Sequence, residues 1–270
     1  MSFRLRRVVQ SAAVAALCVC AGAPAASAQE PLAAAPEAVE FLPRFDLKLI
    51  AAGLGHQDQR FSWDTHWVGD FDLLNYKRGR ATFLADYQAL LGREFRPFDP
   101  YQSNYLLEAS GSFFAGNTEV AAVLNHVSRH LGDRPKRNAI AENSLGIRVM
   151  RRFSATGTGT SLDVRADARK IIQRSYVDYT WMTDLDLWVR QRVHPHAAIY
   201  GRAYGELIPV DRTIAGRSAQ RGGRVEAGVR LEGTDGALEL FGGYEQMIDA
   251  DPLDRLPRRW AFWGFRLRAH

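Results

Sequence analysis

The stretch LDVRADAR (residues 162–169) decides the fold, because apolar and charged residues alternate along its whole length. Successive side chains of a β-strand point to opposite faces, so the stretch predicts a strand with one apolar and one charged face. The charged face carries carboxylates and guanidinium groups that are able to pair. The period is two, not the 3.6 of an amphipathic helix.

The same period of two continues along the chain from about residue 45. Each segment sets apolar residues against polar or charged ones. The segments are residues 45–51, 63–73, 81–88, 104–113, 117–128, 144–151, 162–169, 179–190, 199–207, 224–232, 237–246 and 261–268. They predict about 12 strands, an even number, as single-chain bacterial barrels have.

One apolar face and one face charged with both signs favour a membrane barrel over a soluble β-sandwich. A sandwich keeps its polar face outside, and that face is seldom so densely charged. A barrel pairs its backbone by closure and satisfies its lumen with salt bridges and water. We therefore predict an all-β fold, an antiparallel up-and-down transmembrane β-barrel over residues 44–270, in the outer membrane of a Gram-negative-type cell envelope.

The start of the chain has the pattern of a cleaved signal peptide. Three arginines within the first seven residues precede a short apolar run over residues 12–20, and Ala-Ser-Ala at 26–28 fits a cleavage site. No later run of about 18 apolar residues predicts a transmembrane helix. We expect an exported chain with a signal peptide over residues 1–28 and a periplasmic lead-in, rich in alanine and proline, over residues 29–43.

Removal of that signal peptide leaves no cysteine and little net charge. Both cysteines, Cys18 and Cys20, lie within it, which excludes a disulfide framework and a cysteine metal site. The net charge falls from +5 to +2, with 32 basic and 30 acidic side chains, which does not fit a nucleic-acid-binding protein. We predict no cofactor. The predicted partners are outer-membrane lipids, lipopolysaccharide and the barrel-assembly machinery.

Connection lengths agree with a barrel whose N-terminus is periplasmic. The predicted inner turns are residues 115–117, 193–196 and 233–236, and the predicted outer loops are residues 92–102, 129–141, 209–222 and 246–258. The inner turns are short and rich in turn-forming residues. Short inner turns and longer outer loops are the asymmetry expected of bacterial barrels.

The stretch NHVSRHLGD (residues 125–133) holds the strongest candidate for chemistry. In a strand, His126, Ser128 and His130 stand on one face, because side chains two apart point the same way. If the preceding apolar residues of that face meet lipid, these three lie near the headgroup level. A slip of one residue would place them in the lumen instead, as part of a polar network.

The run from Asn125 through His126 to Ser128 resembles the outer-membrane phospholipase A barrels. Those enzymes also have 12 strands and carry an Asn-His-x-Ser run on the outer barrel face. The resemblance implies that His126 accepts the Ser128 proton as the hydroxyl attacks an ester. It also implies an asparagine on the following strand that orients the imidazole, for which Asn143 and Asn138 are the candidates.

Two further resemblances concern the same motif. The lipid A deacylase barrels also use a His-x-Ser pair, and Glu142 is the corresponding third residue. The phospholipase motif continues Asn-Gly-Arg after the serine, whereas this chain has Arg-His-Leu at 129–131 and no clear counterpart of the calcium-binding loop. The run His-x-Ser-x-His-Leu-Gly-Asp is similar to a family of uncharacterised exported barrels, which implies no activity.

Basic residues of the predicted outer loop form a candidate lipid-phosphate site. They are Arg129, Arg134, Lys136 and Arg137. The planar guanidinium of arginine suits lipopolysaccharide phosphates, although a merely solvated loop is an equal alternative. His126, His130 and Asp133 have a spacing seen in metal sites, but a strand end does not preset coordination geometry, and we predict no metal site.

Two functions follow from this sequence. The first is an integral outer-membrane barrel of unassigned activity, with a charged lumen and basic surface loops, acting as a structural wall or a small-solute pore. The mixed charge of that lumen argues against strong ion selectivity. The alternative is a serine lipid hydrolase that uses His126 and Ser128, so the sequence leaves open whether the chain is an enzyme. The face on which these two side chains stand distinguishes the two functions.

Overall fold

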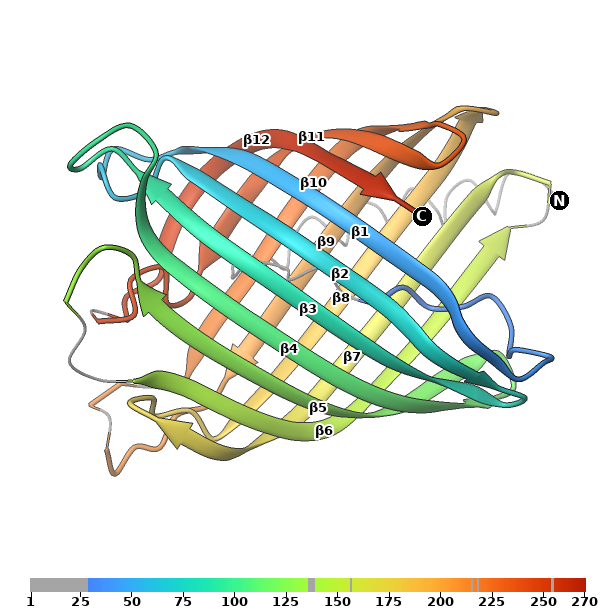
Figure 1. The fold of residues 1–270 in the computed structure, drawn as a ribbon, viewed down its shortest axis with the longest axis horizontal. Helices are drawn as coiled ribbons and strands as arrows, with labels where there is room; N and C mark the ends of the chain where they lie inside the picture. The colour runs from blue at the N-terminus through green and yellow to red at the C-terminus, as the bar shows by residue number, and fades with distance from the viewer. Residues whose placement is uncertain (1–28, 136–138, 156, 215, 218, 254) are drawn as a thin grey trace, which may run out of the picture.

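The computed structural model describes residues 29–135, 139–155, 157–214, 216–217, 219–253 and 255–270. These residues form 12 antiparallel strands in one closed barrel, in which each strand pairs with its sequence neighbours and the last pairs with the first (Figure 1). The strands are β1 (Glu40–Gly55), β2 (Trp63–Tyr76), β3 (Gly79–Gly92), β4 (Asp99–Ala115), β5 (Thr118–Leu131), β6 (Ile140–Ala155), β7 (Thr160–Ser175), β8 (Trp181–His194), β9 (Ala197–Ile208), β10 (Gln220–Glu232), β11 (Gly236–Met247) and β12 (Arg258–Ala269).

The predicted all-β, up-and-down barrel is confirmed. Most strands extend beyond the segments predicted for them, because pairing continues past the clean alternation. The segment predicted from residue 179 begins later, at Trp181. Tyr179 makes an isolated bridge with Val210 instead, and its fully buried hydroxyl donates to Asp249 at 2.5 Å. The predicted signal peptide, residues 1–28, lies outside the described residues.

The two ends of the barrel differ in their connections. At the end where β1 begins and β12 stops, the other strands are joined by residues 77–78, 116–117, 156–159, 195–196 and 233–235. We call this the turn end. Gly116 lies in one of these turns with φ +61°, a conformation that favours glycine. The connections at the opposite end, the loop end, are longer, which is the asymmetry that the sequence predicts.

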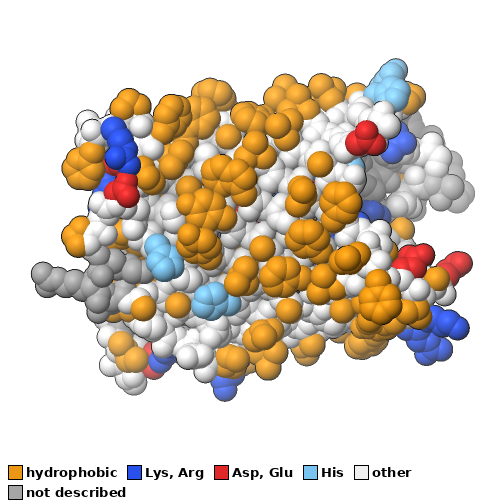
Figure 2. All heavy atoms as spheres, in the orientation of Figure 1, with side chains coloured by type: hydrophobic (Ala, Val, Ile, Leu, Met, Phe, Trp, Pro, Cys, Tyr) orange, Lys and Arg blue, Asp and Glu red, His pale blue; other side chains and the backbone are white. Residues whose placement is uncertain are grey.

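The two faces of the barrel wall differ in chemistry. On β5, Leu124 faces outward and is 50% exposed, whereas its neighbour Asn125 faces inward and is 2% exposed. Figure 2 shows hydrophobic side chains spread over the visible side of the barrel wall, with charged side chains towards its two ends. No helix of the described residues is long and apolar enough to span a membrane.

Inward-facing charges pair either between adjacent strands or across one intervening strand. Examples are Arg80–Glu119, Arg148–Glu108, Arg165–Asp184, Arg202–Asp186, Arg230–Glu239 and Arg266–Glu226. A buried charge is tolerated when it is paired and hydrogen-bonded. The alternation that builds each strand therefore also brings opposite charges together inside the barrel.

The connection between β11 and β12 folds into the barrel mouth at the loop end. Residues 248–251 are buried. The Asp251 carboxylate accepts hydrogen bonds from the Tyr101 hydroxyl at 2.6 Å and from Arg60 at 2.5 Å. Tyr101 also packs in an apolar cluster with Trp260. This connection narrows the loop end of the lumen.

Candidate functional site

The candidate site lies on the outer face of β5, near the loop end. His126 and Ser128 are half-buried and His130 is exposed, on the same face as Leu124. The alternating residues Asn125 and Val127 are buried in the lumen. The structure therefore places the three side chains on the outer surface, and the alternative with the opposite facing does not occur. Figure 2 shows two histidines, in pale blue, among the hydrophobic side chains of this surface.

Strand register places Asn143 directly opposite His126. The two residues are cross-strand partners on β5 and β6, and His126 Nδ1 lies 2.6 Å from Asn143 Oδ1. Side chains at such positions are near enough to interact. The Asn143 amide nitrogen in turn donates to Gln173 Oε1 on β7 at 2.8 Å. A polar chain thus crosses three strands on the outside of the barrel.

Ser128 makes its hydrogen bond with the other histidine. Its Oγ lies 2.7 Å from His130 Nε2. Within the described residues, the hydroxyl bonds to His130 and not to His126. The ring of Tyr105, the cross-strand partner of Ser128 on β4, meets the His130 ring edge-on at 5.4 Å between centroids. We call His126, Ser128, His130, Asn143 and Gln173 the outer polar row.

Apolar and aromatic side chains surround the outer polar row. Leu107 and Leu145 flank it on β4 and β6 and are 44% and 50% exposed. A line of aromatic rings reaches it from the side, with centroid separations of 5.5 Å between Trp67 and Tyr87 and 5.1 Å between Tyr87 and Tyr105. Tyrosine and tryptophan collect at the membrane–water interface. The row therefore lies where a headgroup region is expected.

The structure separates the other candidate third residues from this site. Glu142 points into the lumen, 2% exposed, and accepts hydrogen bonds from Arg129 at 2.7 and 2.8 Å. It stands on the opposite face of the wall from His126, so the deacylase-like triad is not assembled. Asn138 lies outside the described residues. Of the candidates in the described residues, Asn143 alone contacts His126.

The predicted lipid-phosphate group is not brought together as one surface. Arg129 faces the lumen, because β5 continues to Leu131 and the alternation turns this side chain inward, where it also lies 3.5 Å from Asp249. Arg134 is engaged by Glu94 at 2.6 Å and by Asp99 at 2.7 Å. Both arginines are thus held by carboxylates of this chain. Lys136 and Arg137 lie outside the described residues.

The spacing that resembles a metal site is not assembled either. Asp133 forms an ion pair with Arg96 in the loops, and His130 bonds to Ser128. Across the described ranges, no group of three or more histidine, cysteine, aspartate or glutamate side chains is arranged to hold a metal ion.

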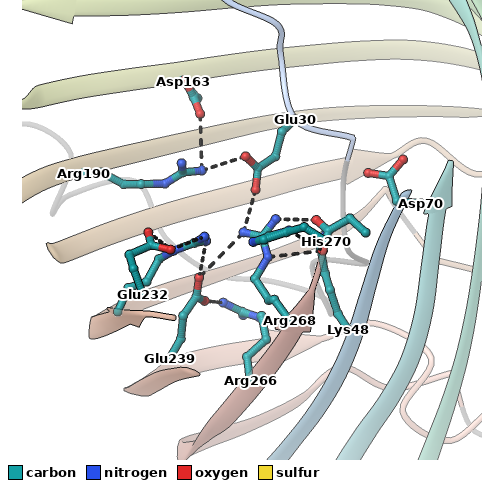
Figure 3. A network of polar contacts seen from close by, with 12 residues as sticks. Glu30, Lys48, Asp70, Asp163, Arg190, Glu232, Glu239, Arg266, Arg268 and His270 are labelled. Atoms are coloured by element: carbon teal, nitrogen blue, oxygen red, sulfur yellow. Dashed lines mark hydrogen bonds and ion pairs between the residues drawn. The ribbon is translucent and has the colours of Figure 1, made fainter. Parts of the chain in front are cut away.

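Sequence reasoning missed the position of the N-terminal segment. The lead-in predicted over residues 29–43 divides in two. Its last residues belong to β1, which starts at Glu40, whereas Gln29 and Pro31 are buried and Glu30 joins an ion-pair network inside the barrel (Figure 3). No alternation marks residues 29–31, so the sequence held no signal for this placement beyond a lone carboxylate.

Comparisons with known proteins support the fold. No protein-family model matches the chain, and no curated protein matches it. Among solved structures, an outer membrane channel from Pseudomonas putida F1 is similar with a TM-score of 0.54 at 12% identity, covering 91% of this chain and 99% of the channel. Outer membrane phospholipase A from Escherichia coli is similar with a TM-score of 0.52 at 11% identity, covering 83% of this chain and 92% of the enzyme.

A third solved structure is also similar in fold at low sequence identity. The outer membrane phospholipase dimer of Salmonella typhi, with bound calcium, gives a TM-score of 0.51 at 12% identity, over 83% of this chain and 90% of that chain. The resemblance to phospholipase A barrels that the sequence predicts is therefore confirmed for the fold. At such identities the likeness carries no information on activity.

Proposed function

We propose that this protein is an outer-membrane lipid hydrolase in which Ser128 is the nucleophile, His126 the general base and Asn143 the residue that orients the base. The observation that carries the proposal is the 2.6 Å contact between His126 Nδ1 and Asn143 Oδ1, beside a serine on the same outer face. A serine is activated when a neighbouring base is itself held by a third group.

The Asn143 contact determines which imidazole nitrogen acts as the base. The Asn143 amide nitrogen donates to Gln173, so its oxygen faces His126. An amide oxygen only accepts, which assigns the proton to His126 Nδ1 and leaves the lone pair on Nε2. That nitrogen takes the Ser128 proton as Oγ attacks the carbonyl carbon of an ester, and returns it to the alcohol as the ester C–O bond breaks. Water that loses a proton to the same nitrogen then cleaves the acyl-serine, which releases the fatty acid and restores the serine hydroxyl.

His130 holds the Ser128 hydroxyl in the state described here. Ser128 and His126 are two residues apart on one face, a rise of about 6.6 Å along the strand. Rotation about the Ser128 χ1 torsion between staggered positions moves the hydroxyl from His130 towards His126. We assign the base to His126 rather than His130, because His126 has the orienting amide.

The substrate class follows from the face on which the site opens. The outer polar row is set among apolar side chains and beside a line of aromatic rings, so it meets lipid rather than luminal water. An ester near the headgroups of the outer membrane is the bond within reach. The predicted export signal and the barrel fold support an outer-membrane location, with lipids, lipopolysaccharide and the barrel-assembly machinery as partners.

Hydrolysis of a lipid ester tests the proposal. The purified full chain, in mixed micelles with phosphatidylethanolamine, should release fatty acid, and Ser128→Ala should abolish this release. Ser144→Ala is the matched control, because Ser144 is buried on the luminal face of β6. Equal turnover by the wild type and Ser128→Ala would rule out Ser128 as the nucleophile.

A further inference from the structure

The N-terminal segment, residues 29–31, lies inside the turn end of the barrel. Gln29 is 3% exposed, and its side-chain amide lies within hydrogen-bond distance of Arg80 and Arg148. The Glu30 carbonyl oxygen accepts one from Arg80 at 2.7 Å. The segment belongs to no strand, so it is held by side chains of the barrel wall and not by a backbone ladder.

The Glu30 carboxylate sits among three arginines from different parts of the wall, and Figure 3 shows two of them, Arg190 and Arg268, beside it. It lies 2.8 Å from Arg268 on β12, 3.1 Å from Arg190 on β8 and 3.6 Å from Arg152 on β6. We call these three residues the arginine cage. Because the three arginines come from β6, β8 and β12, a single carboxylate forms ion pairs with strands that are not neighbours in the barrel.

The carboxylates of the wall only partly neutralise the arginine cage. Asp163 is shared between Arg152 and Arg190, at 2.6 and 3.5 Å. Asp46, which pairs with Arg268, is shared with Lys48 at 3.2 Å. Three guanidinium groups thus meet two shared wall carboxylates at close range. Glu30 supplies the further negative charge.

Glu239 contributes little to neutralising the arginine cage. It lies 3.8 Å from Arg268 and is already paired with Arg230 and Arg266. Burial raises the free energy of the Glu30 carboxylate, yet Arg268 and Arg190 outweigh burial and hold the pKa of Glu30 well below its usual value. The cage therefore favours an anion at this half-buried position.

The segment is attached to the barrel wall through a link that belongs to no strand. Residues 32–39, which join it to β1, are half-buried or exposed and form no strand. A cavity of about 20 Å³, roughly the volume that one water molecule needs, lies beside the segment and is lined by Arg165, Asp186 and Trp188. The ion pairs of Glu30 and the hydrogen bonds of the segment join it to the wall.

We propose that the arginine cage is a binding site for a small oxyanion, which Glu30 occupies as an internal substitute, and that the N-terminal segment closes the turn end of the lumen until such an anion displaces it. Carboxylate and phosphate groups share the planar or tetrahedral oxygen arrangement that guanidinium groups bind. This site is separate from the outer polar row and does not depend on hydrolase activity.

A spin label next to the segment tests the displacement. Removal of the predicted signal peptide leaves a chain without cysteine, in which Ala33→Cys provides a single labelling site, and Ala33 is exposed. In the detergent-solubilised protein, inorganic phosphate should increase label mobility at concentrations where sodium chloride of equal ionic strength does not. Salt alone acts by screening, so that comparison isolates binding of the oxyanion.

Substitutions identify the groups responsible. Glu30→Gln should lower the phosphate concentration needed for release by about tenfold or more, since an ionic hydrogen-bonded contact contributes about that factor. Glu37→Gln, in the exposed link, is the matched control and should titrate as the wild type does. Arg190→Gln should leave the label mobile without phosphate and weaken its response to phosphate.

Heat-modifiable migration on gels confirms that each variant is a folded barrel before it is compared. Equal responses to phosphate and sodium chloride would overturn the oxyanion site. The role of the cage in holding the segment would be overturned if Glu30→Gln needed as much phosphate for release as the wild type, or if the label in Arg190→Gln stayed immobile without phosphate.

Discussion

His126 and Arg148 lie on neighbouring strands and show how differently the two faces of one wall use polar residues. Arg148 points inward and is satisfied by Glu108 at 2.5 Å and Asp167 at 2.9 Å. His126 points outward among apolar side chains and contacts the neutral amide of Asn143. Inside, Arg148 and its two carboxylates neutralise one another, so a structural role explains all three. Outside, an apolar residue would serve the wall as well, so the outer polar row calls for a chemical explanation.

The largest expected effect is on lipid-ester turnover, and it should distinguish one outward-facing histidine from one inward-facing histidine. His126→Ala should reduce lipid-ester turnover by about 10²–10⁴-fold, the usual contribution of a general base. His66→Ala should leave turnover near the wild-type value, because His66 is buried in the lumen between Asp64 and Asp86. Fatty-acid release measures both variants. Similar losses from the two substitutions would remove the distinction between the faces.

The free energy of unfolding should depend on the inward-facing residue and hardly at all on the outward-facing one. Arg148→Ala leaves the buried carboxylates of Glu108 and Asp167 without this partner, and breaking a buried ion pair costs about 3–5 kcal/mol. His126→Ala should change the unfolding free energy by less than about 0.5 kcal/mol, as surface substitutions do. Denaturant unfolding in detergent measures the two. A stability loss for His126→Ala as large as that for Arg148→Ala would assign the outer polar row a structural role.

Loss of the orienting amide of Asn143 should lower kcat less than loss of the base does. Asn143→Ala removes one hydrogen bond to His126, which contributes about 0.5–1.5 kcal/mol, and should lower kcat by about 2- to 10-fold. Gln173→Ala acts only through Asn143 and should lower it by less. Steady-state kinetics at saturating lipid gives the order of effects. If Gln173→Ala costs more than Asn143→Ala, the polar chain does not act in the order proposed.

Lowering the pH should have the smallest effect of all. It should release the N-terminal segment only at low pH, through protonation of Glu30. The charged groups around Glu30 are Arg152, Arg190, Arg268, Lys48, Asp46 and Asp163. Since the pKa of Glu30 is held well below its usual value of 4.5, its contact is fully present above that pH and is lost only as pH falls through the lowered value. A label at residue 33 should therefore show no change between pH 8 and 6. Release near neutral pH would contradict the assignment.

The sequence predicts the barrel well, because a single pattern, the alternation of apolar and charged residues, specifies its strands. Alternation such as that of residues 162–169 determines strand, facing and luminal charge together, and a shift of one residue would expose every charge to lipid. The same rule explains the one misplaced arginine. Arg129 was expected on an outer loop, but β5 extends past it and the alternation turns it inward.

The site was predictable only in part. His126 and Ser128 are neighbours within one strand, so their common face follows from local sequence. The choice among Asn138, Glu142 and Asn143 depends on the register between β5 and β6, which no local pattern sets. The N-terminal segment is harder still, because its place depends on arginines from β6, β8 and β12 that meet only after the barrel closes.

Covalent labelling of Ser128 tests the central claim most directly. An alkyl fluorophosphonate reacts with an activated serine, whose oxygen bonds to phosphorus as fluoride leaves and the proton passes to the base. We predict that mass spectrometry of the wild-type protein finds the adduct on Ser128, that His126→Ala abolishes it, and that the luminal Ser144 stays unmodified. An unmodified Ser128, or equal labelling in His126→Ala, would contradict the account.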